Sequence, residues 1–376
     1  MAGIYVHIPF CRKFCHYCDF YHVISEGDHT PYIEALLKEA DIRKDYLGSD
    51  IISSLYLGGG TPSVFSVGEL DKILSFLRKN YAIDKDCEIT IELNPDDISR
   101  NYVKGLKQLD INRLSLGIQS WRDEDLKMLN RRHDSKQVSE ALKIFENEGF
   151  DNVSADLIYG LPGMNVKDLE DNLKKTFSYN VKHLSAYHLT IEEGTVFYRM
   201  KEKGKLEETD EEESVAEFNR LIEITEEEGF IHYEISNFGK EGYFSVHNTN
   251  YWKQIPYIGL GPSAHSFNRY SRQWNVSDLK NYIKAVNNNK PFYEKEEIDL
   301  KTKFNEYILT SLRTMWGIDL EYVENTFEKE GYDYIINLSG KFINYGLMEQ
   351  KEKALMLTNQ GKMISDNIIS EFIMPQ

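Results

Sequence analysis

Basic residues are scarce in this chain of 376 residues. Its 44 lysines and arginines are outnumbered by 61 aspartates and glutamates, and the formal net charge is −17. A nucleic acid or an anionic membrane needs a basic protein surface, so the charge argues against a nucleic acid partner and allows at most peripheral membrane contact. No apolar run is long enough to span a membrane, and nothing at the N-terminus resembles a signal peptide. We therefore expect a cytoplasmic protein.

Cysteine is scarce as well, but three of the four cysteines, Cys11, Cys15 and Cys18, lie within eight residues. A disulfide framework would need a dispersed, even set, and a zinc finger would need a second pair of ligands. Three clustered thiols suit a [4Fe-4S] cube with one iron left open for an exchangeable ligand. The alternative is a loop with three unrelated thiols in a reducing cytosol. Cys87 stands alone, and a lone thiol more often has a packing role.

Short apolar and β-branched runs alternate with amphipathic helices from residue 4 to about 190. The runs predict six strands, at 4–8, 52–57, 88–93, 113–117, 153–158 and 183–190. The helical pattern between them is clear at Leu70, Ile73, Leu74 and Leu77. This alternation is typical of an α/β fold with a parallel sheet, and a curled six-stranded sheet is a partial (β/α)6 TIM barrel. In such folds, function gathers at the carboxyl ends of the strands.

Each predicted strand is followed by polar or glycine-rich residues. In chain order these are the cysteine loop, the glycines 58–60 with Thr61, then Glu92, Gln119, Asp156, and finally Tyr187 with His188. A glycine triplet lets a ligand approach the backbone, and free amides there would bind a carboxylate. Carboxylates and an amide suit a ligand with hydroxyl groups and a positive charge. Taken singly, each residue could equally be an ordinary partner of a loop.

The motifs around these residues resemble a known family. Cys-x3-Cys-x-Tyr-Cys resembles the signature of radical S-adenosylmethionine (SAM) enzymes, in which SAM fills the open iron. Ile-Tyr-Val-His-Ile-Pro-Phe-Cys, Leu-Gly-Gly-Gly-Thr-Pro, Ile-Glu-Leu-Asn-Pro, Leu-Gly-Ile-Gln-Ser, Leu-Asn-Arg and Asp-Leu-Ile-Tyr-Gly-Leu-Pro-Gly are similar, in order, to the oxygen-independent coproporphyrinogen III oxidase family.

This resemblance implies that Cys11, Cys15 and Cys18 bind the cluster. It also implies a set of SAM contacts: Tyr5, Tyr17, Gly59, Gly60, Thr61, Glu92, Gln119, Arg131 and Asp156. Arg131 is the candidate for the SAM carboxylate, and Arg132 beside it is the alternative.

The run His-Asn-Thr-Asn-Tyr-Trp at 247–252 resembles the signature of the haem chaperone branch of this family. Imidazole is a common ligand of haem iron and aromatic rings can stack on a porphyrin, so haem b is expected at His247, Tyr251 and Trp252. From the spacing alone, a histidine, a tyrosine and a tryptophan packed together at a corner of the fold are the more common explanation of this run. His265 is a weaker candidate for lining the same cavity, and Trp274 adds another aromatic surface.

Three segments are predicted along the chain. Residues 1–200 form the radical SAM barrel core, and residues 201–300 complete the barrel and carry the haem motif. Residues 301–376 form a small winged-helix-like α+β module with two helices, a hairpin at 346–358 and a last helix. The acidic character of this module argues against DNA binding.

Two departures distinguish the chain from the decarboxylating oxidase. Phe20 stands where the oxidase has a further cysteine, and the chain begins four residues before Tyr5, without the oxidase's N-terminal extension. The resemblance thus favours a haem chaperone that carries a SAM-ligated cluster and delivers haem to apo-haemoproteins such as respiratory-chain cytochromes, without coproporphyrinogen oxidase activity. The radical SAM oxidative decarboxylase of porphyrin biosynthesis is the second hypothesis, and a different radical SAM enzyme is the third. The sequence leaves a homodimer open.

Overall fold

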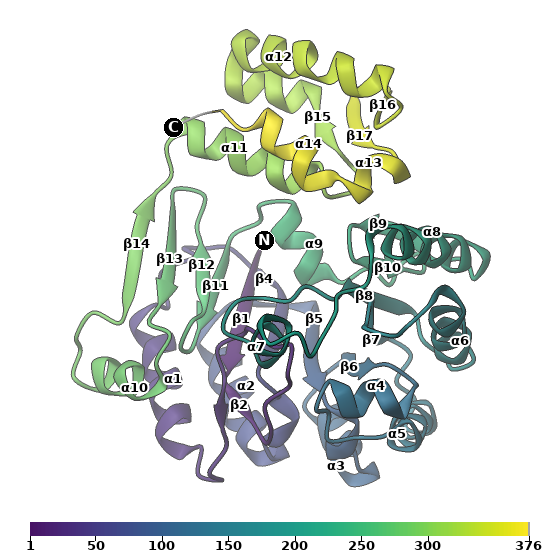
Figure 1. Ribbon diagram of the computed structural model, residues 1–376. Helices are drawn as coiled ribbons and strands as arrows, with labels where there is room; N and C mark the ends of the chain where they lie inside the picture. Colours follow the sequence, from purple (N-terminus) through teal and green to yellow (C-terminus); the bar gives the residue numbers. More distant parts are fainter. Residues whose placement is uncertain (375–376) are drawn as a thin grey trace.

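A curved sheet of twelve strands dominates the computed structural model, which describes residues 1–374 (Figure 1). All six predicted strands are present, and neighbouring ones are parallel. They are β1 (Ala2–Ile8), β4 (Ile52–Gly59), β5 (Ile83–Leu93), β6 (Arg113–Gln119), β7 (Val153–Tyr159) and β8 (His183–His188). They lie side by side in chain order, which confirms the partial (β/α)6 barrel.

Later parts of the chain extend this sheet at both edges. Beside β1 lie β11 (Tyr257–Leu260), which is parallel to it, and then the antiparallel β12 (His265–Phe267), β13 (Ser271–Asn275) and β14 (Tyr293–Glu297). Beside β8 lie β10 (Asn237–Gly239) and β9 (Ile231–Glu234). Within the described residues β8 does not pair with β11, so the barrel stays open.

Helices connect the parallel strands, as the amphipathic pattern predicts. They are α1 (Thr30–Ile42), α2 (Val67–Asn80), α3 (Arg100–Gln108), α4 (Asp123–Met128), α5 (Ser135–Asn147) and α6 (Val166–Phe177). The predicted stripe of α2 is fully buried, and a capping box fixes its start: Ser66 Oγ accepts from Glu69 N while the Glu69 carboxylate accepts from Ser66 N. Shorter or later helices are η1 (Pro62–Val64), η2 (Pro95–Asp97), α7 (Val196–Glu202), α8 (Glu211–Glu227), α9 (Val246–Trp252) and α10 (Leu279–Asn287).

The C-terminal module has its own hydrophobic core, between Phe304 and Phe372. Its elements are α11 (Leu300–Ser311), β15 (Ile318–Asp319), α12 (Leu320–Asn344), β16 (Met348–Lys351), β17 (Ala354–Leu357), α13 (Asn359–Met363) and α14 (Ser365–Phe372). The predicted hairpin is β16 and β17, and β15 adds a third strand. No helix in residues 1–374 is both long and apolar enough to cross a bilayer.

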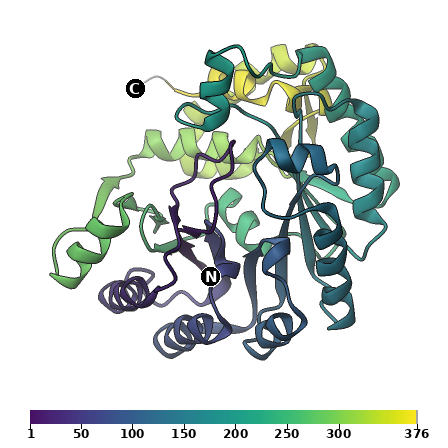
Figure 2. The same cartoon turned by 60° about the horizontal axis from the view of Figure 1, so that its bottom comes forward.

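The module lies at the end of the barrel where the strands begin. Figure 1 shows the N-terminus and α9 between the module and the sheet. Main-chain hydrogen bonds join the two parts: Ile235 N donates to Arg313 O at 3.1 Å, and Met315 N donates to Tyr233 O at 2.9 Å. The cysteine loop leaves β1 at the opposite end, which Figure 2 turns toward the viewer. The two ends of the barrel are therefore covered by different parts of the chain.

A buried polar network attaches α1 to the added strands. Glu39 and Arg43 are buried on α1 and form an ion pair of 2.9 Å. The Arg43 guanidinium also donates to Ser266 Oγ at 2.8 Å and to Gln273 Oε1 at 3.0 Å. Asn275 Nδ2 donates to Glu39 at 2.7 Å. Because each partner is buried, removing one would leave the others without compensation.

We predict that Arg43→Ala lowers the free energy of unfolding by about 3–5 kcal/mol, because the Glu39 carboxylate stays buried without its cation. Urea unfolding followed by circular dichroism measures this change. The control is Arg100→Ala, whose pair with Glu148 involves an arginine side chain that is 67% exposed. That variant should lose less than about 1 kcal/mol. Equal losses in the two variants would contradict the role of the network.

Candidate functional site

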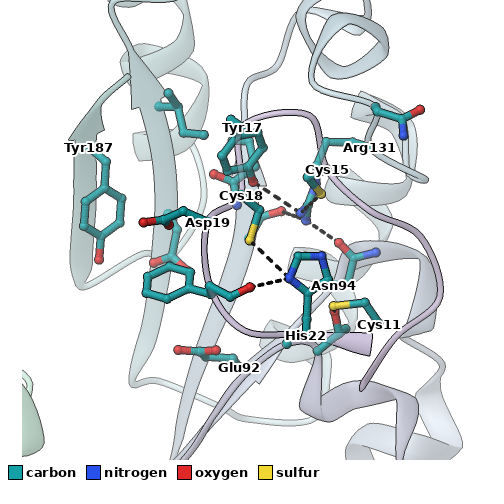
Figure 3. A pocket seen from close by; sticks show the side chains of 18 of the residues that line it. Cys11, Cys15, Tyr17, Cys18, Asp19, His22, Glu92, Asn94, Arg131 and Tyr187 are labelled. Atoms are coloured by element: carbon teal, nitrogen blue, oxygen red, sulfur yellow. Dashed lines mark hydrogen bonds between the residues drawn. The ribbon is translucent and has the colours of Figure 1, made fainter. Parts of the chain in front are cut away.

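A cavity of about 420 Å³ lies at the carboxyl ends of the parallel strands (Figure 3). Its walls include the three predicted cluster cysteines and eight of the nine predicted SAM residues: Cys11, Cys15, Cys18, Tyr17, Gly59, Gly60, Thr61, Glu92, Gln119, Arg131 and Asp156. Figure 3 shows Cys15 beside Arg131, with Tyr187 on the facing wall. Residues from six strand ends thus meet in one place, as a parallel sheet requires.

Tyr5 is the predicted SAM residue that does not line this cavity. It lies inside the barrel on β1, where its hydroxyl is 3.0 Å from His7 Nδ1. His7 in turn donates from Nε2 to Tyr21 O at 3.0 Å, at the end of the cysteine loop. In this structure Tyr5 therefore supports the loop through His7.

The cysteine loop is held by residues far along the chain. Apart from the short paired strands β2 (Phe10–Cys11) and β3 (Val23–Ile24), it has no regular structure. His16 N donates to Leu129 O at 3.1 Å, and His16 Nδ1 donates to Met128 O at 2.9 Å. Asn130 Nδ2 donates to Phe14 O at 2.7 Å. The last residue of α4 and the two residues after it therefore fix the position of the cysteine loop.

The three thiols are free and have different neighbours. Cys11 Sγ lies 3.4 Å from Thr61 Oγ1, Cys15 Sγ lies 3.4 Å from Arg131 Nη1, and Cys18 Sγ lies 3.9 Å from His22 Nδ1. In residues 1–374, no three cysteine, histidine or acidic side chains converge closely enough for a single metal ion. Spaced thiols fit a cube, because each thiolate there binds a different iron.

The structure distinguishes the two neighbouring arginines. Arg132 is paired with Asp96 at 2.9 Å. Arg131 lies in the cavity wall, where Nη1 donates to Cys15 Sγ and Nη2 donates to Gly117 O at 3.1 Å. Its buried Nε has no hydrogen-bond partner among the described residues. Since a buried donor is normally satisfied, this atom fits an absent carboxylate or similar acceptor.

Glu92 and Asp156 line the cavity, and neither forms an ion pair within residues 1–374. Glu92 accepts from Tyr56 OH at 2.8 Å and from Gly59 N at 3.0 Å, and Asp156 accepts from Ser115 Oγ at 3.1 Å. Burial raises the pKa of Glu92 to about 7, and the nearby Asp156 charge adds to this effect. Burial also raises the pKa of Asp156. A cationic ligand rich in hydroxyl groups would compensate both carboxyls.

The prediction of free amides in the glycine triplet was wrong. The amides of residues 59–61 donate to the Glu92 carboxylate and to main-chain oxygens of Ile8 and Phe10. At Gly60 an added Cβ would lie 2.8 Å from Phe10 O, which is too close. Gly60 thus lets β4 pack against the end of β1, and the amides of Gly59 and Gly60 are not free to bind an anion.

His247 lies at the other end of the barrel, with its ring buried among the first residues of the strands. Nδ1 is 2.8 Å from Ser54 Oγ, Nε2 is 2.8 Å from Tyr251 OH, and the ring stacks on Tyr56 at 5.1 Å. Burial, with a smaller contribution from the Arg113 charge, lowers the pKa of His247 to about 3. The imidazole is therefore neutral, and both its nitrogens are engaged.

Trp252, on the same helix, lines a second cavity of about 670 Å³ between the barrel and the module. His265 and Trp274 line neither this cavity nor the first one. They are cross-strand neighbours on β12 and β13, with ring centroids 6.4 Å apart. The expectation that His265 lines the cavity of the haem motif is therefore not met at the cavity that Trp252 lines.

Sequence reasoning gave no role to several residues of the first cavity, including Asn94, Ser115 and Asn130. Asn130 precedes Arg131 in the Leu-Asn-Arg motif and has a φ of 61°, in the left-handed region. Asparagine tolerates that conformation better than most residues, so Asn130 could have been recognised from the sequence as a turn residue. Its contact with the cysteine loop depends on tertiary structure and has no local signal.

Comparisons with known proteins agree with this geometry. The family model described as "Radical SAM superfamily" matches residues 5–176. "Heme chaperone HemW" of Bacillus subtilis is 32% identical, with 99% of each chain covered. "Heme chaperone HemW" of Lactococcus lactis is 32% identical over 98% of this chain and 97% of that one. The structure of coproporphyrinogen III oxidase HemN from Escherichia coli has a TM-score of 0.86 and 23% identity, covering 99% of this chain and 90% of that one, so it supports the fold.

We predict that anaerobically reconstituted protein holds about four irons, and that alanine at Cys11, Cys15 or Cys18 abolishes the cluster, because a cube with an open iron has no spare thiolate. Iron and sulfide analysis with EPR spectroscopy, with and without SAM, measures this. The matched control is Cys87→Ala, since this thiol is buried and does not line the cavity. Loss of iron in the control would show that the cluster uses a fourth cysteine.

Proposed function

This chain belongs to the HemW family of the radical SAM superfamily, and from that membership we propose that it is a haem chaperone. It binds haem b and a SAM-ligated [4Fe-4S] cluster, and it delivers haem to acceptor apo-haemoproteins such as respiratory-chain cytochromes. The observation that carries the proposal is the nearly full-length similarity to proteins named heme chaperones.

Membership of the superfamily implies a [4Fe-4S] cluster and SAM. When bound, they supply an electron donor and a source of the deoxyadenosyl radical. Cys11, Cys15 and Cys18 would hold the cluster, and Arg131 would donate from its unpaired Nε to the SAM carboxylate. Glu92 and Asp156 would accept hydrogen bonds from ribose hydroxyls. Cys18 must lose its proton when it binds iron. Burial raises the pKa of this thiol to about 12, so cluster binding has to displace the proton.

We assign haem binding to the segment around α9, which carries His247, Tyr251 and Trp252. In the present conformation His247 could bind an iron only if it gave up its contact with Ser54 or Tyr251. Its contribution here is to hold Tyr251 and the helix in place, and Trp252 offers the aromatic surface. This arrangement puts haem and the cluster at opposite ends of the barrel.

The decarboxylating oxidase is the second candidate, and no observation favours it. The similarity to HemN supports the fold alone, because the two sequences are only 23% identical. Phe20, at the position of the oxidase's further cysteine, lines the cluster cavity and is 67% exposed. Decarboxylation of a propionate by a radical needs a site closed to water, and an exposed phenylalanine does not close one.

We predict that the protein binds haem stoichiometrically and that His247→Ala weakens this binding, because α9 loses both hydrogen bonds of the imidazole. Titration followed at the Soret band measures the affinity. The cluster spectrum should be unchanged, since the cysteines lie at the other end. Unaltered haem affinity and an unaltered Soret band in His247→Ala would exclude His247 from the haem site and contradict its role in holding α9.

We also predict that reconstituted protein with SAM and a reductant forms no protoporphyrinogen IX from coproporphyrinogen III. Product analysis by liquid chromatography measures this, with an active HemN preparation as the positive control. Robust turnover that disappears in Cys15→Ala would establish the oxidase and overturn the chaperone.

A further inference from the structure

The cavity between α9 and the C-terminal module has no part in the cluster site. Its volume is about 670 Å³, within the range of roughly 300–1,000 Å³ that holds organic ligands. The barrel contributes the end of α9 and Phe267, and the module contributes α11, the turn before β15 and the tip of the β16–β17 hairpin. Figure 1 shows this meeting of α9 with the module. A ligand here would touch both parts of the protein at once.

Two tryptophans give the cavity flat apolar surfaces, one from each part. Trp252 belongs to α9, and Trp316 belongs to the turn of the module; both are half-buried. Phe267, Ile255 and Ile298 add further apolar surface. Half-buried tryptophans at a cavity suit a large planar ligand that stacks on them, and at Trp316 the Lys253 ammonium, which lies over the ring, would move aside to meet the ligand.

The charges of this cavity differ from those of the chain as a whole. Five basic and four acidic side chains line it, although the chain carries a net charge of −17. Lys353 is paired with Glu321 at 2.7 Å, and Arg269 is paired with Asp50 at 3.1 Å. Lys351 is also paired.

The two remaining lining cations, Lys253 and Lys303, form no ion pair within the described residues. Lys253 Nζ lies 4.4 Å from the ring centroid of Trp316, so one of these charges stands directly beside an apolar surface. Two ammonium groups without a carboxylate partner around an aromatic cavity match a flat, apolar ligand with two carboxylates.

We propose that this cavity is the haem site, with the porphyrin between Trp252 and Trp316 and its two propionates at Lys253 and Lys303. The proposal rests on the haem chaperone function and adds the C-terminal module to the binding site. The cluster and SAM would fill the cavity of about 420 Å³ at the other end. Haem therefore needs separate space, and this second cavity provides it.

The lining also indicates how the cargo is held. No histidine, cysteine or methionine is among the residues that line the cavity. The Tyr307 hydroxyl accepts from Asp319 N at 2.8 Å. Haem is thus held by its faces and its propionates and not by a strong axial ligand. Such a site leaves the iron open to an acceptor protein's own ligand, which is what delivery requires.

The test compares haem affinities of full-length variants that have matched controls. Trp316→Ala should weaken haem binding roughly tenfold, as loss of a central aromatic contact does. Trp274→Ala is its control, because that tryptophan lies outside the cavity. The double charge reversal Lys253→Glu with Lys303→Glu should also weaken binding roughly tenfold, more at low salt, whereas Lys301→Glu on the same helix should not. The charge variants keep the test informative if Trp316→Ala unfolds the module.

Iron-free protoporphyrin IX is the second probe, and we expect it to bind within roughly tenfold of haem, because stacking and propionate contacts do not involve the iron. Wild-type affinity in both the Trp316→Ala and the charge variants would overturn this site while leaving the chaperone function intact. Failure of iron-free porphyrin to bind would also overturn it, by showing that axial ligation dominates. Absence of haem binding by the wild-type protein would refute both the function and the site.

Discussion

The hydrogen bonds between the cysteine loop and the segment at residues 128–131 are the constraint on which the cluster site depends. The loop contains little regular structure, so it cannot hold three thiols around a cube by itself. His16 and Phe14 are fixed to Met128, Leu129 and Asn130. The next residue, Arg131, turns into the cavity and reaches Cys15. The same short segment therefore positions both the metal ligands and the proposed SAM contact.

The cavity beside this loop contains groups that are costly to bury without a ligand. Glu92 and Asp156 are half-buried carboxyls that form no ion pair within residues 1–374, and Arg131 Nε is a buried donor without an acceptor there. A buried polar atom without a partner, such as Arg131 Nε, typically costs about 1–3 kcal/mol. A ligand that supplies hydroxyl groups, a positive charge and a carboxylate would recover much of that cost. Ligand binding and stability of this end of the barrel are thus coupled.

Most of the fold could be predicted because hydrophobic periodicity is a local property. All six parallel strands and the α2 stripe followed directly from it, and the parallel arrangement then gathered the strand-end residues into one cavity. The glycine amides were mispredicted because their partners, Ile8 and Phe10, lie on a neighbouring segment. Trp316 was missed because its importance arises only where the module meets α9. The position of His265 was not predicted because its pairing with Trp274 on β13 is a tertiary contact without a local signal.

A barrel with two different ends is the central claim: the cluster at the carboxyl ends of the strands, and haem beyond their amino ends. β1 has seven residues, so it alone separates the two ends by roughly 20 Å at about 3.3 Å per residue. Pulsed EPR on protein that carries the reduced cluster and copper(II) protoporphyrin IX in place of haem measures their separation through dipolar coupling. The account predicts weak coupling, corresponding to a distance of about 20 Å or more. Strong coupling of adjacent centres would place the porphyrin at the cluster and contradict it.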